Sequence, residues 1–250
     1  MKNLPLIGLL LFTSIATAQA DRQQYGPVPE KITGSIDGSV PSDAIVLFDG
    51  SNMDAWVTAA EEEPARWEIA DGAMTVRRGM RTIKTKQSFG DIQLHLEWRP
   101  TDVTEGEGQS RGNSGVFLHS IFEVQILDSW ENPTYVNGQA GSVYLQYPPL
   151  VDAARRPGEW QTYDIIFEAP EYDVSGNLTE PAYVTVMHNG VLVQNHVELE
   201  GATYTPAPEY SARCVPWSQE REQDCSGKMP IMLQDHGQVV SYRNIWVREL

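Results

Sequence analysis

Six titratable side chains carry most of the acid–base chemistry that this sequence could perform. Four are carboxylic acids and two are imidazoles, and all lie on or directly after short runs of β-forming residues. Such groups exchange protons with a reacting centre when their pKa values lie near the working pH. The candidate acids and bases are Glu97, Glu123, Asp128, Asp235, His119 and His236.

Strand alternation predicts that part of this set shares a polar face with amides and an arginine. Successive side chains of a strand point to opposite sides of its sheet. Apolar partners such as Leu96 and Val124 therefore belong to the core, together with Asp128, and Asp235 points away from its two neighbours. The outward set is Gln93, His95, Glu97, Arg99, His119, Glu123, Gln125, Gln234 and His236.

The composition of this face favours a sugar ligand over plain solvent. An antiparallel sheet normally has one solvated side, so any single member is more often ordinary surface than catalytic. Planar amide, imidazole, guanidinium and carboxyl groups beside aromatic rings nevertheless suit sugar hydroxyls and C–H faces. We therefore predict a carbohydrate site on a polar sheet face.

Other chemistries have no matching motif. A conventional glycosidase needs two carboxylates, about 5 Å apart in retaining enzymes or about 6.5–9.5 Å apart in inverting ones. Strand alternation alone does not give the distance between carboxylates on different strands. No nucleophile elbow, phosphate loop, dinucleotide fingerprint or local histidine metal pattern is present in the sequence. No cofactor is predicted, and a divalent cation held by loop carboxylates is left open.

Short β-rich runs between turns must position these residues. Asp71-Gly72 and Asn189-Gly190 mark tight hairpins, no long stretch keeps a 3.6-residue period, and no internal repeat is found. About a dozen runs at this spacing predict an all-β fold of two stacked antiparallel sheets, a jelly roll. The expected strands are 45–48, 67–69, 73–76, 92–98, 115–119, 122–127, 143–147, 162–168, 183–188, 191–197, 231–233 and 242–248.

Two long polar loops, 101–112 and 198–229, interrupt this pattern. Loops of that length in a compact domain are usually functional rims or lids, so either could border the site.

The N-terminus predicts export. Lys2 precedes an apolar run from Leu4 to Ala16, and Ala18-Gln19-Ala20 fits a signal-peptidase site. About 13 apolar residues are too few for a permanent membrane span, although an uncleaved anchor is the alternative reading. We expect a signal peptide over 1–20 cleaved after Ala20, an extended arm over 21–43, a jelly-roll domain over 44–250, and a periplasmic or secreted protein free of the membrane.

Cysteine and charge content narrow the partners. Cys214 and Cys225 are the only cysteines, and in an oxidising compartment a disulfide between them is the simple interpretation. A formal charge of −16 argues against nucleic acid, because phosphate contacts need Lys and Arg. A carbohydrate is the expected partner, and the sequence does not indicate an oligomeric state.

Ordered blocks of sequence resemble the bacterial family named for 3-keto-disaccharide hydrolase activity. They run from Leu47 to Leu250, and each block alone is a weak motif while the ordered set is specific. The blocks are LFDG with Trp56 (47–56), WEIADGAMTV (67–76), FGDIQLHLEWR (89–99), NSGVFL (113–118), FEVQILDSW (122–130), GQAGSVYLQYPPLV (138–151), PGEWQTYDIIFEAP (157–170), HNGVLVQNHVEL (188–199), and PIMLQDHG with YRNIWVREL (230–250).

The resemblance implies a concanavalin- or LamG-like jelly roll and a substrate whose sugar is a ketone at C3. The ketone acidifies the C2 proton, so a base can remove it, the C1–O bond can break by β-elimination, and hydration completes a net hydrolysis. This route needs a base near C2, donors to the enolate oxygen and an acid at the leaving oxygen.

Roles for the site residues follow as a hypothesis. Glu123 is the expected base, Arg99 or His119 the enolate stabiliser, and His236 or Glu97 the acid. His119 stands where the family more often has Arg. The expected substrate-binding residues are Gln125, Asn113, Gln234, Asp128, Tyr144 and Asp235, of which the two aspartates could instead brace turns. The alternatives are a non-catalytic carbohydrate-binding module and a conventional glycosidase.

Overall fold

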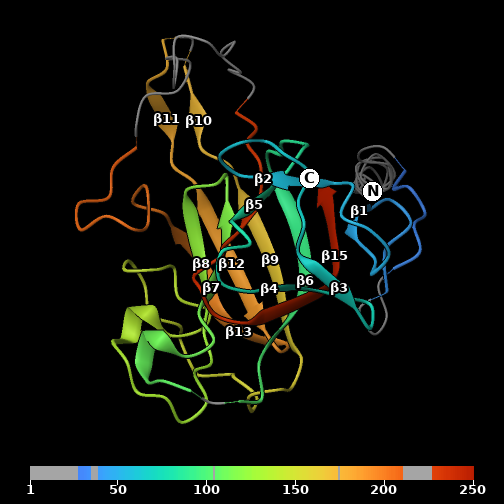
Figure 1. Cartoon of the computed structure of the whole chain (residues 1–250). Coiled ribbons are helices and arrows are strands. Elements are labelled where there is room, and N and C mark those ends of the chain that lie inside the picture. The colour runs from blue at the N-terminus through green and yellow to red at the C-terminus, as the bar shows by residue number, and fades with distance from the viewer. Residues whose placement is uncertain (1–27, 35–38, 104, 174, 211–226) are drawn as a thin grey trace, which may run out of the picture. The chain divides into compact units, whose positions relative to one another are not determined.

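Two antiparallel sheets packed face to face form the body of the protein (Figure 1). The computed structural model describes residues 28–34, 39–103, 105–173, 175–210 and 227–250. The chain divides into two units, Met1–Thr33 and Gly34–Leu250. The described part of the first, 28–33, has no regular secondary structure, and every strand among the described residues belongs to the second. Nothing among the described helices is long and apolar enough to span a bilayer.

The larger sheet has eight strands in the order β13-β12-β9-β6-β15-β4-β3, with β1 also paired to β15. All its pairings are antiparallel, and β15 and β6 form its centre. Its strands are β1 (Ile45–Phe48), β3 (Glu68–Ala70), β4 (Ala73–Val76), β6 (Ile92–Pro100), β9 (Gln161–Glu168), β12 (Tyr183–His188), β13 (Val191–Glu198) and β15 (Val240–Glu249).

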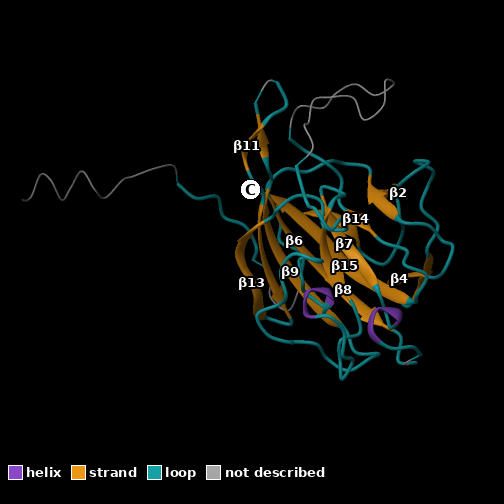
Figure 2. Cartoon of the chain, turned by 90° about the vertical axis from the view of Figure 1, so that its left-hand side faces the viewer, coloured by secondary structure: helices purple, strands orange, loops and turns teal. Residues whose placement is uncertain are grey.

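The smaller sheet has five strands in the order β2-β5-β14-β7-β8. These are β2 (Trp56–Thr58), β5 (Ile83–Thr85), β14 (Met232–Leu233), β7 (Ser114–Leu118) and β8 (Phe122–Ile126). The ribbon β10 (Glu171–Tyr172) with β11 (Leu178–Glu180) stands apart from both sheets, and two short 3₁₀ turns, η1 (Gly108–Ser110) and η2 (Val136–Gly138), are the described helical segments (Figure 2).

The core lies between the sheets, and in β9 alternate residues from Gln161 to Phe167 are buried. Leu94, Leu96 and Trp98 of β6 face Val116 and Val124 of the smaller sheet within this core. Two tyrosines of the larger sheet also reach across it. Tyr163 donates to the Gln125 carbonyl at 2.7 Å, and the Tyr242 hydroxyl lies 2.6 Å from Ser114 Oγ. These buried hydrogen bonds hold β7 and β8 on the face that is turned to the core. The opposite, outer face of the two strands is left for a site.

The all-β jelly-roll prediction is confirmed, and two local expectations are wrong. Residues 143–147 form turns rather than a strand, because Leu145 has a φ of 63° and the backbone closes on Val143. His119 does not extend β7: His119 and Ser120 have φ values of 51° and 58°, and Ile121 N donates to Leu118 O. Two positive φ values with that hydrogen bond define the type I′ turn favoured in tight hairpins.

Candidate active site

Glu123 lies at the centre of the outer face of β7 and β8. It pairs in register with Phe117, while Gln125 pairs with Gly115. Phe122, Val124 and Ile126 take the opposite face and fill the core, so alternation sends Glu123 and Gln125 outward. Asn113, directly before β7, continues this face beside Gln125, with Nε2 of the glutamine 3.5 Å from Asn113 Oδ1.

Loops cover this face, so Glu123 is buried although it points away from the core. Its side chain is only 4% exposed. Thr203 accepts a hydrogen bond from Glu123 N at 3.0 Å, and Tyr144 N donates to Glu123 O at 3.1 Å. Tyr204 packs its ring against Phe117, with centroids 6.4 Å apart. The loops at 143–147 and 201–205 thereby enclose the glutamate from two sides.

The carboxyl group of Glu123 is held in a dry setting without a cationic partner. No Lys, Arg or His of the described residues forms an ion pair with it. Burial raises the pKa of Glu123 to about 8, because removing the charged form from water costs free energy and no cation of the described residues offsets that cost. A carboxyl group that titrates near neutral pH can both take up and release protons in a reaction.

An amide cluster borders the glutamate. Gln109 Nε2 donates to Gly138 O at 2.9 Å, and Gln109 Oε1 accepts from Asn113 Nδ2 at 3.2 Å. Gln125 lies between this cluster and Glu123. Its amide nitrogen faces the carboxyl group and donates to Glu123 Oε1 at 3.1 Å and to Ser114 O at 3.2 Å. Gln125 therefore gives the carboxyl group a neutral hydrogen-bond donor.

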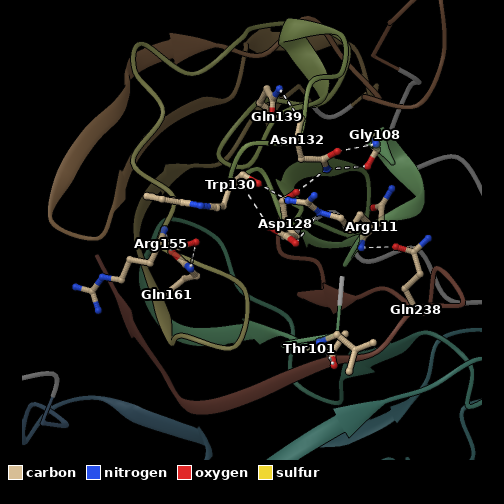
Figure 3. Close-up of polar contacts among 12 residues, drawn as sticks. Thr101, Gly108, Arg111, Asp128, Trp130, Asn132, Gln139, Arg155, Gln161 and Gln238 are labelled. Atoms are coloured by element: carbon tan, nitrogen blue, oxygen red, sulfur yellow. Dashed lines mark hydrogen bonds and ion pairs between the residues drawn. The ribbon is translucent and has the colours of Figure 1, made fainter. Parts of the chain in front are cut away.

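A second network anchors the loop that supplies Gln109 (Figure 3). Asn132 accepts from Gly108 N at 2.7 Å and donates to Gly108 O at 3.1 Å. Arg111 Nε lies 2.7 Å from Asp128 Oδ2, and the same guanidinium donates to Trp130 O. These contacts tie η1 to the segment after β8, so Gln109 is fixed over the sheet although it comes from a loop.

A tyrosine pair completes the site. The hydroxyl groups of Tyr135 and Tyr144 are 2.6 Å apart. Burial, the hydrogen bond to Tyr144 and the nearby charge of Glu123 all raise the pKa of Tyr135. Tyr135 packs on Gly138, where a Cβ would overlap its ring. The Tyr135 hydroxyl therefore stays protonated at neutral pH and can donate a hydrogen bond close to Glu123.

The structure brings five of the predicted residues together. Gln234 N donates to Gly115 O at 3.1 Å, which places Gln234 beside the glutamate on β14's side. Its Oε1 is buried and has no donor among the described residues. The gathered residues are Glu123, Gln125, Asn113, Tyr144 and Gln234.

Glu97 and Arg99 are not part of this site. They lie on the outer face of β6, in the other sheet, with the whole core between them and Glu123. Glu97 pairs there with Arg243 at 2.6 Å, and Arg99 stacks on Trp160 with its guanidinium carbon 4.6 Å from the ring centroid. The expectation of one common polar face is wrong, because each sheet has its own.

His119 is also displaced from the predicted face. The turn at its positive φ directs the ring into the interior, where it meets Phe167 edge-on with centroids 4.9 Å apart. His119 Nε2 lies 2.8 Å from Phe89 O. This buried environment supports the packing of the hairpin and not contact with a sugar on the outer face.

The remaining three predicted residues have other surroundings. Asp128 is buried and pairs with Arg111, as described above. Asp235 accepts hydrogen bonds from the backbone N–H groups of Gly79 and Arg81, each at 2.9 Å, and so braces that turn. His236 is exposed in the segment between β14 and β15. Both aspartates have structural contacts that account for them.

Gln109, Tyr135 and Gly115 belong to the site but were not predicted. Gln109 and Tyr135 come from loops, where no periodicity relates a residue to a sheet face. Gly115 stands opposite Gln125, and a Cβ there would overlap Glu123 Oε1 and lie 2.8 Å from Phe117 Cε2. A glycine inside a strand pattern is itself a sign of close approach, and this signal could have singled out Gly115.

Two expectations concern other parts of the chain. Cys214 and Cys225 lie outside the described residues, as does the proposed signal peptide, so both stay predictions. Within the described part of the chain, no three His, Cys, Asp or Glu side chains gather as metal ligands.

The fold and the glutamate-centred face define a carbohydrate-active β-sandwich when they are set beside related proteins. The family described as the 3-keto-alpha-glucoside-1,2-lyase-like domain matches residues 43–248. The chain belongs to this family. No curated protein matches it.

Solved structures from Parabacteroides distasonis ATCC 8503 share the fold. One of them, a proposed glycosyl hydrolase, is 43% identical in sequence to this chain and superposes with a TM-score of 0.79. The alignment covers 92% of this chain and 96% of that structure's chain. Two further proposed glycosyl hydrolases are 18% and 22% identical to this chain, with TM-scores of 0.59 and 0.54, respectively. Each alignment covers 83% of this chain, and they cover 94% and 99% of the two other chains, respectively. These two show the fold alone.

Proposed function

We propose that this chain is an exported enzyme that cleaves the glycosidic bond of 3-keto-glycosides. The single observation that carries the proposal is the buried Glu123 carboxyl group, whose pKa is raised to about 8. The family match supports a substrate of this class, since the family is described by a 3-keto-alpha-glucoside.

The reaction needs one base and one proton donor rather than two flanking carboxylates. Glu123 removes the proton from C2, which the C3 ketone makes acidic, and the electron pair forms an enolate. Collapse of the enolate expels the C1 oxygen, which leaves with a proton, and gives an enone between C1 and C3. Addition of water at C1 and return of a proton to C2 complete a net hydrolysis.

The surroundings of Glu123 fit the base. A desolvated carboxylate is a stronger base than one in water, since its conjugate acid has the higher pKa. The neighbouring amide of Gln125 donates to the Glu123 carboxyl group at 3.1 Å and carries no positive charge.

The tyrosine pair takes the roles that Arg99, His119, Glu97 and His236 were expected to fill. With hydroxyls 2.6 Å apart, one tyrosine can donate to a substrate oxygen while the other donates to the first. Such a donor stabilises charge that develops on an enolate or leaving oxygen. Asn113 and Gln234 are positioned along the same face to hold sugar hydroxyls.

Two alternatives fit the site less well. A conventional glycosidase needs a second carboxylate near the first, and a neighbouring negative charge would add to the pKa shift of Glu123. Burial is the one cause of that shift, so no carboxylate of the described residues acts on it strongly. A binding module gains nothing from a buried carboxyl group without a partner, since burying it costs stability.

Turnover of matched substrates tests the proposal. The purified protein is incubated with 4-nitrophenyl 3-keto-glucoside and with the parent 4-nitrophenyl glucoside, and nitrophenol release is followed. Release from the ketone alone is expected. Equal release from both would indicate a conventional glycosidase, and binding without release would indicate a binding module, so either result contradicts the proposal.

A further inference from the structure

A cleft opens on the outer face of the larger sheet, on the opposite side of the core from Glu123. Its volume is about 580 Å³, within the range of small-molecule sites. Strands β3, β4, β15 and β6 form its floor, and the segments at 101–102 and 158–160 form one wall. Its position separates it from the glutamate site by the whole hydrophobic core.

Small side chains make the floor of this cleft. Ser241 pairs in register with Thr75 on one side and with Arg99 on the other, so these three side chains form one row across the sheet. Thr75 Oγ1 and Ser241 Oγ are 2.8 Å apart, and Ala73 lies two residues before Thr75 on the same face. The row therefore offers two hydroxyl groups at the bottom of a hollow.

Two arginines share one tryptophan at the wall. The guanidinium carbons of Arg99 and Arg243 lie 4.6 and 4.1 Å from the ring centroid of Trp160. Stacking on an aromatic face orients a guanidinium group and leaves its in-plane N–H donors available. Arg243 already donates to Glu97 from Nε and Nη2, so Arg99 is the arginine on this ring whose donors are available to a ligand.

Arg99 differs from the other arginines of the cleft in its charge balance. Arg243 is neutralised by Glu97 at 2.6 Å, and Arg77 by Glu68 at 3.1 Å. Arg99 has no carboxylate within ion-pair distance among the described residues, although the chain as a whole carries a formal charge of −16. Asp71 and Asp102 also line the cleft, but both are exposed to solvent, which screens their charge.

We propose that this cleft binds a sugar that carries a carboxylate group. Arg99 pairs with the carboxylate through two parallel N–H···O bonds, the geometry that guanidinium groups favour. The hydroxyls of Thr75 and Ser241 and the carboxylates of Asp71 and Asp102 exchange hydrogen bonds with the sugar hydroxyls. The site is independent of the Glu123 chemistry and would serve to hold the protein on an acidic glycan.

Binding of a matched pair of sugars tests this site. Isothermal titration calorimetry compares methyl β-D-glucuronide with methyl β-D-glucoside, which differ only by a carboxylate in place of a hydroxymethyl group. The glucuronide is expected to bind at least tenfold more tightly. Equal affinity for the two sugars, or no binding of the glucuronide at 10 mM, would overturn the proposal.

Variants locate the binding on the larger sheet. Arg99→Gln is expected to weaken glucuronide binding at least tenfold, and Arg99→Lys to weaken it less, because the charge remains but the two-pronged geometry is lost. Arg66→Gln, an exposed arginine outside the cleft, and Glu123→Gln should bind as the unmodified protein does. Thermal unfolding checks that each variant is folded. Unchanged binding by folded Arg99→Gln, or loss of binding in Glu123→Gln, would refute the site.

Discussion

The carboxyl group of Glu123 occupies the space that a side chain at position 115 would fill. A Cβ built on Gly115 would overlap Glu123 Oε1, and it would also lie 2.8 Å from Phe117 Cε2. Gly115 does not have a positive φ, so its backbone is open to any residue. A glycine is therefore needed at position 115 because any Cβ there would occupy the place of the Glu123 carboxyl group.

Replacing Gly115 by alanine should displace the glutamate without unfolding the sheet. The new methyl group must push aside the end of a flexible side chain, and misplacement of a catalytic group by about 1 Å can cost about 10²-fold in rate. We expect kcat/KM on a 3-keto-glucoside to fall at least tenfold in Gly115→Ala. Steady-state kinetics measure this effect.

Gly90→Ala is the matched control, because the nearest atom to a Cβ there is Lys228 Cγ at 3.7 Å, an ordinary van der Waals contact. It should leave kcat/KM within about twofold. If folded Gly115→Ala is as active as the unmodified protein, catalysis does not depend on the observed position of the Glu123 carboxyl group.

Removing the base should abolish most of the activity. Glu123→Gln keeps the shape of the side chain but cannot accept the C2 proton, and loss of a general base typically costs 10²–10⁴-fold. The same variant should fail to exchange the C2 proton of 1,5-anhydro-3-keto-glucitol with deuterium in D₂O, as followed by NMR. Exchange isolates the first step, since this compound has no glycosidic leaving group.

Glu159→Gln, at an exposed glutamate, provides the comparison and should retain both turnover and exchange. Deuterium exchange by Glu123→Gln at an undiminished rate would assign the base to another residue.

Strand alternation could be read from the sequence because it is a local property. It sent Glu123 and Gln125 to the face opposite Val124, and the structure has the same division. The number of strands and their turn residues likewise led to two stacked sheets. These features depend on neighbours along the chain, so a single sequence carries them.

Sheet membership could not be read in the same way. Glu97 and Glu123 both alternate with core residues, but β6 pairs with β9 and β15 whereas β8 pairs with β7. Those pairings join segments as far apart as Glu97 and Arg243, and alternation contains no information about them. The prediction therefore merged two polar faces that lie on opposite sides of the core.

Turn and loop residues escaped prediction for a related reason. His119 was assigned to a strand, but its φ of 51° makes it the first residue of the hairpin turn. Gln109 reaches the site from η1 because Asn132 holds Gly108, a contact between residues 24 positions apart. The polar loops 101–112 and 198–229 were each expected to border a site, and Gln109 is a site residue from the first of them.

The pH dependence of turnover should report the ionisation of Glu123. A base must be ionised to act, and burial raises the pKa of this carboxyl group to about 8. Between pH 6 and 7 the ionised fraction, and with it kcat/KM, should rise about tenfold, and it should level off above about pH 8. Rates on a 3-keto-glucoside across pH 5.5–9.5 measure the profile. A rate that falls with pH over this range would instead make Glu123 the acid.

The hydroxyl pair of Tyr135 and Tyr144 should contribute to the rate without holding the fold. Tyr144→Phe removes one of two hydroxyls that are 2.6 Å apart and leaves the ring, so packing against Tyr135 is kept. Loss of one donor to a developing charge costs about 10²–10³-fold in well-formed sites, and we expect kcat to fall 10-fold or more here.

Tyr147→Phe is the control, because the Tyr147 hydroxyl donates instead to Glu200 at 3.1 Å, and it should change kcat by less than about threefold. Equal kcat values for the two variants would remove the tyrosine pair from the mechanism.

Burial of Glu123 should make the protein less stable as pH rises. The folded carboxyl group has a pKa of about 8, against 4.5 when it is free of the fold, so between these values the folded state binds more protons than the unfolded state. The free energy of unfolding therefore decreases with pH from about 4.5 to about 8, by up to a few kcal/mol, and this contribution stays lost above that range. Glu123→Gln has no charge to bury, so its Tm should exceed that of the unmodified protein at pH 9 and approach it at pH 5. Thermal unfolding of both proteins at these two pH values measures the difference, and a Tm difference that does not change with pH would show that the glutamate is not desolvated in the folded protein.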